Sequence, residues 1–172
     1  MEVVTTYSTT ESEAQPSPDS LEMQYEQERG KPMPSKNHAI IQGNAYFELR
    51  NQYGNQFDVF TELSLDLTSG KAVPDLCIYE KTPRNWQVDV IKTKETPLLA
   101  IEILSPKQNF NDIVDKMNNI YFPAGMKSVW VVLPPAESIM VFKPNEKTKT
   151  YNEGILNDAA SGFELNLDKI FI

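Results

Sequence analysis

Apolar residues recur with helical spacing in two stretches of the chain. The first stretch predicts a helix over residues 36–53, with Ser35 as its N-cap and Gly54 at its end. Its apolar stripe consists of Ile40, Ile41, Ala45 and Leu49. The second predicts a helix from residue 106 to Gly125, because Ser-Pro-Lys-Gln at 105–108 has the pattern of a capping box with proline at the first helical position.

Other stretches have the pattern of β-strands, which we expect at residues 61–67, 73–79, 97–104, 128–133 and 138–143. Residues 97–104 are nearly all apolar, which is typical of a strand covered on both faces. Pro74 indicates an edge strand or the start of a strand, and residues 80–96 are expected to form a loop. The order of helix, three strands, helix and two strands favours an α/β or α+β fold, with helices packed on a sheet.

Composition and charge divide the chain at its N-terminus. Residues 1–20 are predicted to form a disordered acidic tail, and residues 21–172 a single domain. Within this domain, residues 21–35 are expected to form two short extended pieces. The net charge is −8, of which −6 falls in residues 1–30, so the rest of the chain is nearly neutral. This balance excludes a general polycationic DNA binder but not a nuclease, whose metal ions supply positive charge.

The expected location is the cytoplasm, with no membrane partner. No apolar run approaches the length of about 18 residues that a spanning helix needs. The N-terminus has no secretory signal, and the single cysteine, Cys77, suits a reducing compartment.

Several kinds of active site are excluded by residue counts. One histidine and one cysteine cannot build a zinc site of the usual kind. The glycine motifs of nucleotide-binding folds and the Gly-x-Ser-x-Gly elbow do not occur. Carboxylates on strands remain as the candidate chemistry.

Asp75 and Glu102 lie within two of the most apolar stretches of the sequence. A buried, unpaired carboxylate costs several kcal/mol, so each must be paired, protonated or bound to a cation. If their strands are neighbours, the two carboxylates converge on one hard cation, with the carbonyl of Ile103 as a third ligand. A structural ion pair or an exposed edge is an equally good interpretation of the two acids alone.

Four segments together resemble the Uma-type restriction endonucleases, within the PD-(D/E)xK nuclease superfamily. They read RGKPMPSKNHAIIQ, VPDLCIYEK, LLAIEILSPKQ and DKMNNIYFPAGMKSVWVV, and the resemblance runs from about Glu22 to Ile172. It implies a restriction-endonuclease-like central mixed β-sheet flanked by helices, and Mg²⁺-dependent phosphodiester cleavage, with Mn²⁺ as a substitute. Asp75 and Glu102 match the two metal-binding acids of the family.

The sequence departs from the superfamily at Leu104, where the superfamily places a lysine two positions after the second acid. The resemblance implies that a lysine on the next helix replaces it, and Lys116 matches that position. A surface lysine paired with Asp112 at i, i+4 is about as good an interpretation of Lys116.

Three further residues are candidates for accessory roles. Glu62 matches an acid often seen in relatives and could be a further ligand, although a solvated position on the polar face of a strand is the commoner role. His38 falls on the Pro-Ser-x-x-His segment of the family and could act near the phosphate, although a lone histidine at a helix start is more often structural. Gln108 would lie at the start of the second helix, where amides could hold a phosphate, but its default role is capping.

The first functional hypothesis is a metal-dependent endonuclease acting on DNA, in which Asp75, Glu102 and Lys116 are catalytic. The second is a catalytically silent nuclease-fold module that binds a partner. Leu104, in the position where the superfamily has a lysine, favours this hypothesis. A third is a homodimeric scaffold joined through residues 128–143. The residues do not decide between DNA and RNA.

Overall fold

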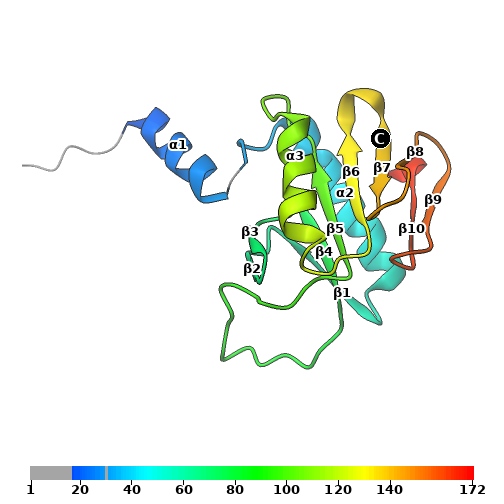
Figure 1. Ribbon diagram of the computed structural model, residues 1–172, viewed down its shortest axis with the longest axis horizontal. Helices are drawn as coiled ribbons and strands as arrows, with labels where there is room; N and C mark the ends of the chain where they lie inside the picture. Colours follow the sequence, from blue (N-terminus) through cyan, green and yellow to red (C-terminus); the bar gives the residue numbers. More distant parts are fainter. Residues whose placement is uncertain (1–16, 30) are drawn as a thin grey trace, which may run out of the picture.

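A six-stranded mixed sheet forms the centre of the protein in the computed structural model, which describes residues 17–29 and 31–172 (Figure 1). Its order is β1-β4-β5-β6-β7-β8, and only β5 and β6 are parallel. The strands are β1 Phe57–Thr61, β4 Leu76–Glu80, β5 Leu99–Ile103, β6 Val129–Leu133, β7 Ser138–Phe142 and β8 Lys149–Tyr151. The expected fold class, a mixed sheet flanked by helices, is confirmed.

Helices cover both faces of this sheet, with α3 in front and α2 behind it in Figure 1. Helix α2, Lys36–Tyr53, packs its buried side chains on the face that carries Leu76, Ile101 and Trp130. The other face is covered by α3, Phe110–Lys116, and by η1, a π-helical turn over Met117–Tyr121. This α3–η1 segment is the crossover that a parallel pair such as β5 and β6 requires.

Two hairpins and two short helices complete the domain. The hairpins are β2 Leu65–Leu67 with β3 Gly70–Ala72, and β9 Ile155–Asp158 with β10 Phe163–Asn166. The 3₁₀ helices are η2 Pro134–Ala136 and η3 Leu167–Lys169. Within residues 17–29 and 31–172, no helix is both long and apolar enough to cross a membrane.

The first predicted helix is confirmed with its bounds and its caps. The Ser35 hydroxyl accepts a hydrogen bond from the His38 N–H, and the Gly54 N–H bonds to the Arg50 carbonyl. Its predicted stripe is wrong at one position, because Ile40 is 42% exposed while His38 is buried. His38 faces the sheet because its ring has polar partners there, which apolar periodicity does not reveal.

The first of the two extended pieces predicted over residues 21–35 is wrong, because Pro18–Arg29 forms helix α1, which lies to the left of α3 in Figure 1. Residues 31–35 have no regular secondary structure. The start of α1 has the signature of a helix N-terminus. The Ser17 hydroxyl accepts from the Ser20 N–H, and Pro18 occupies the first helical position. Of the predicted disordered tail, residues 1–16 lie outside the described residues and 18–20 form the first turn of α1.

The predicted start of the second helix is also wrong. Residues 105–108 form a turn closed by the Gln108 N–H on the Ser105 carbonyl, and α3 begins at Phe110 with Asn109 as its N-cap. Ser105 is not a helix cap, because its hydroxyl bonds to His38 instead.

The predicted strand over residues 61–67 is broken by Glu62, whose φ of 55° is left-handed. The segment therefore divides into the end of β1, which sequence analysis missed, and the short strand β2. Pro74 lies just before β4, in agreement with the predicted start of a strand. The predicted loop after Glu80 and the strands β5, β6 and β7 are confirmed.

Candidate active site

Asp75 and Glu102 occupy opposite register positions at the end of two neighbouring strands. Asp75 directly precedes β4, and Glu102 directly follows Ile101, whose antiparallel partner is Leu76. The register therefore places the two acids opposite each other, and both are buried at 1% exposure. The two apolar strands thus carry both carboxylates to the same end of β4.

Polar contacts surround both the side chain and the backbone carbonyl of Asp75. Its Oδ1 accepts hydrogen bonds from the Lys31 ammonium and from Nε2 of His38, at 3.1 Å for the latter. Its Oδ2 accepts from the N–H of Ile103 at 2.6 Å, and its backbone carbonyl accepts from the Gln42 side chain at 2.9 Å. Segments 44 residues before and 28 residues after Asp75 in sequence therefore hold it in place.

These contacts keep Asp75 ionised. Burial raises the pKa of Asp75, but the His38 hydrogen bond and the Lys31 charge outweigh it, and the pKa falls to about 2. Because an ionised carboxylate only accepts, the His38 Nε2 must carry the proton that it shares with Asp75. Nδ1 of His38 forms a hydrogen bond with the Ser105 hydroxyl, 3.0 Å away.

Glu102 has its own cation. The Lys116 ammonium lies 3.1 and 3.2 Å from the two Glu102 carboxylate oxygens, and its side chain is 12% exposed. The Tyr121 hydroxyl donates to Oε1 of Glu102 at 2.5 Å. In the described part of the chain, the ion-pair partner of Lys116 is Glu102 and not Asp112, so the surface-pair interpretation of Lys116 is wrong.

The π-helical turn explains how Lys116 and Tyr121 reach the same carboxylate. In an α-helix, residues five apart lie about 140° apart around the axis. Over Met117–Tyr121 the chain closes wider turns, with the Phe122 N–H bonded to the Met117 carbonyl at 2.9 Å. This wider turn carries both side chains to the face that meets β5. Single π-turns inside α-helices are frequent at functional sites.

The Tyr121 hydroxyl stays protonated, because burial and the negative charge of Glu102 raise the pKa of Tyr121 well above its ordinary value. We expect Tyr121→Phe to lower the free energy of unfolding by about 1.5–3 kcal/mol, the usual contribution of a hydrogen bond to a charged group. Urea unfolding measures the difference. Tyr151→Phe is the matched control, since the exposed Tyr151 hydroxyl donates to the neutral carbonyl of Asn157. Equal losses in both variants would contradict a specific bond from Tyr121 to Glu102.

The accessory candidates occupy different positions. Among the described residues, His38, Glu62 and Asp75 form a group whose potential ligand atoms lie within 4.8 Å of one another. Glu62 lies in the connection after β1, where its Oε2 is 3.4 Å from the Lys31 ammonium and its Oε1 accepts from Gln42. Gln108 lies apart from this group, in the turn before α3, and its side chain accepts from the Ser105 N–H at 3.4 Å.

The remaining predicted positions surround the two acids. Ile103 contributes its N–H to Asp75, and Leu104 packs beside the apolar cluster under α3. Cys77 is buried on β4, where burial and the Glu102 charge raise the pKa of its thiol to about 12. The Cys77 thiol is thus protonated at neutral pH and is not a nucleophile.

Lys31, Ser105 and Tyr121 are site residues that sequence analysis missed. Lys31 lies in a polar stretch without periodicity, so the only available clue was the need of a buried Asp75 for a cation. The pattern at 105–108 predicts Ser105 as a helix cap, and Tyr121 lies within the second predicted helix without any local sign of a polar contact. The contacts of all three residues span sequence separations of 19 to 67 residues, which local patterns do not predict.

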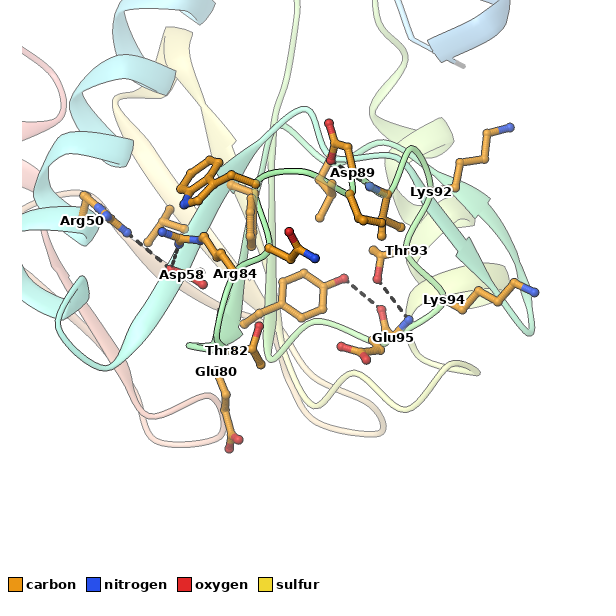
Figure 2. A pocket seen from close by; sticks show the side chains of 18 of the residues that line it. Arg50, Asp58, Glu80, Thr82, Arg84, Asp89, Lys92, Thr93, Lys94 and Glu95 are labelled. Carbon is orange, nitrogen blue, oxygen red and sulfur yellow. Dashed lines mark hydrogen bonds and ion pairs between the residues drawn. The ribbon is translucent and has the colours of Figure 1, made fainter.

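A pocket at the opposite end of β4 is separate from this site. It has a volume of about 880 Å³ beneath the loop over residues 81–95, and none of the candidate site residues lines it. In Figure 2, Arg50 and Arg84 converge on Asp58, which pairs with both guanidinium groups. The Tyr79 hydroxyl donates to the Glu95 carbonyl at 2.9 Å, which ties the loop to the sheet. The contacts of Arg84 and Glu95 therefore hold the loop over residues 81–95 against the sheet.

Comparisons with known proteins identify a family and a similar fold. The family model described as "Putative restriction endonuclease", Uma2, matches residues 9–168. A crystal structure of "a putative nuclease belonging to DUF820 from Anabaena variabilis ATCC 29413" is similar in fold, with a TM-score of 0.69 and 21% identity over 81% of this chain and 83% of that one. None of the curated proteins matches. Because the family model spans nearly the whole chain, including both strands that carry the acids and the helix that carries Lys116, the protein belongs to the Uma2 family.

Proposed function

We propose that the protein is a metal-dependent endonuclease that hydrolyses phosphodiester bonds in DNA. The observation that supports this proposal is that two buried carboxylates occupy opposite register positions at one end of neighbouring strands, and that an ammonium pairs with one of them. Asp75, just before β4, has the register position opposite Glu102 on β5, and Lys116 reaches Glu102 from the next helical segment. Membership of the Uma2 family supports a nuclease as the general class.

The donor set fits a hard divalent cation such as Mg²⁺, with Mn²⁺ as its substitute. Carboxylate oxygens are the ligands these ions prefer, and Asp75 is held in its ionised form. Asp75 and Glu102 would hold the ion, with the Ile103 carbonyl as a further ligand. A cation bound there lowers the pKa of a coordinated water and polarises a phosphate oxygen.

Lys116 supplies the ammonium group that Leu104, in the usual lysine position of the strand, lacks. An ammonium has three donors, and the Glu102 carboxylate takes up to two of them in the described structure. The third can orient a water or neutralise charge that develops on the phosphate. With 12% exposure the side chain can reach a substrate, while Glu102 fixes its position.

His38 and Tyr121 hold the acids and have no separate chemical role in this proposal. The His38 ring links Asp75 to Ser105, and Tyr121 fixes one oxygen of Glu102. Rigid placement of this kind reduces the reorganisation needed when charge develops in the transition state.

The test is nicking of supercoiled plasmid by the purified chain in Mg²⁺, in Mn²⁺ and in EDTA. We expect open-circle product with either ion and none in EDTA. Glu102→Gln is the blank, because it removes a proposed ligand while the partly exposed Lys116 remains hydrated. Circular dichroism verifies that the blank is folded.

Single-stranded DNA and RNA are assayed in parallel. Preferential cleavage of RNA would overturn the DNA assignment. No cleavage of any substrate with either ion would contradict the proposed nuclease and favour the silent nuclease-fold module.

A further inference from the structure

Lys31 places a buried positive charge inside the site. Its side chain is 3% exposed, its ammonium donates to Oδ1 of Asp75, and it lies 3.4 Å from Oε2 of Glu62. Lysine is almost never this buried unless it is paired. The ammonium therefore contacts two of the three members of the group formed by His38, Glu62 and Asp75, which is the arrangement expected around a cation.

The two carboxylate oxygens of Asp75 differ in how many of their lone pairs accept hydrogen bonds. An ionised carboxylate has about four lone-pair positions, two on each oxygen. On Oδ1 both positions are used, by Lys31 and by Nε2 of His38. On Oδ2, one lone-pair position accepts a hydrogen bond from the N–H of Ile103 in the described part of the chain. The open position thus belongs to the oxygen that lies against β5, the strand that carries Glu102.

We propose that the Lys31 ammonium takes the place of a second metal ion, so that the site binds a single divalent cation on the Glu102 side. This inference rests on the proposed metal-dependent function. Nucleases with two metal ions hold them about 3.5–4 Å apart, bridged by shared carboxylates. Here one side of the shared carboxylate, Asp75, already carries a fixed charge of +1 with Glu62 as its second partner. A divalent ion there would have to displace both that charge and its hydrogen bond.

The experiment counts Mn²⁺ ions bound by the full chain, by isothermal titration and by electron paramagnetic resonance. We expect one ion in the wild type, with the six-line spectrum of an isolated ion. Lys31→Met removes the charge but keeps an unbranched apolar stem, and should bind two ions whose spins couple. Lys31→Arg keeps the charge and should bind one.

Two further variants identify the position of the second ion. Lys31→Met combined with Glu62→Gln should return the count to one, because Glu62 is the proposed ligand of the added ion. Lys36→Met is the matched control, since Lys36 is an exposed lysine five residues along the chain, and it should bind one ion like the wild type.

One ion in folded Lys31→Met, at any affinity, would overturn the inference while leaving the metal-dependent function in place. Two coupled ions in the wild type would overturn it in the same way, and this result requires no variant to fold. No bound Mn²⁺ in the wild type would overturn both the inference and the proposed metal dependence.

Discussion

Lys116→Met should lower the rate of Mg²⁺-dependent plasmid cleavage by about 100- to 1000-fold, the usual cost of one preorganised electrostatic contact to a transition state. Methionine keeps the unbranched stem along the margin of the core and removes only the charge. The affinity for Mn²⁺ should stay the same or rise, because a positive charge leaves the neighbourhood of Glu102. The prediction therefore separates the rate of the chemical step from binding of the ion.

The measurement is the initial rate of nicking at saturating Mg²⁺, together with Mn²⁺ titration of the same preparations. Lys127→Met is the matched control, because Lys127 is an exposed lysine shortly after the same helical segment. It should cleave at the wild-type rate. Equal rates for Lys116→Met and the wild type would show that Lys116 is only the structural partner of Glu102.

The positions of Asp75 and Glu102 were predictable because both follow from local rules. An acid inside an apolar strand needs a partner or a cation, and antiparallel neighbours bring opposite residues together. The helix that carries His38 was predictable for a similar reason, since its Ser35 cap and its Gly54 end are local features. What local rules leave open is the order of strands, and with it which side chains surround the two acids.

The partners of Lys31 and Lys116 could not be predicted from the sequence. Lys116 could be matched through the family, but its approach to Glu102 together with Tyr121 depends on a π-turn, which apolar periodicity does not reveal. Lys31 meets Asp75 over a separation of 44 residues and comes from a stretch that was expected to be extended. Asp75 and Glu102 each pair with a lysine, and only the folded structure assigns the two pairs.

Asp75→Asn should lower the free energy of unfolding at pH 7 by about 3–5 kcal/mol, the usual cost of removing one partner of a buried ion pair. The substitution removes the carboxylate that accepts from the Lys31 ammonium, which is 3% exposed, and leaves it the Glu62 carboxylate 3.4 Å away. Glu102→Gln is the matched comparison, because Lys116 is more exposed and Tyr121 can still donate to the new amide oxygen. Its expected cost is about 1–2 kcal/mol. Urea unfolding at pH 7 compares the three proteins.

The difference between the wild type and Asp75→Asn should also depend on pH. Burial raises the pKa of Asp75, but His38 and Lys31 hold it at about 2, below the ordinary value of 3.8. A carboxyl whose folded pKa is depressed contributes stability that is complete above the unfolded pKa and is lost as the pH falls through the folded pKa. The difference should therefore be constant from pH 7 to about pH 5 and shrink from about pH 4 toward pH 2, where protonated Asp75 resembles asparagine. A difference that is below 1 kcal/mol at pH 7, or that does not change between pH 5 and pH 2.5, would contradict an ionised Asp75 paired with Lys31.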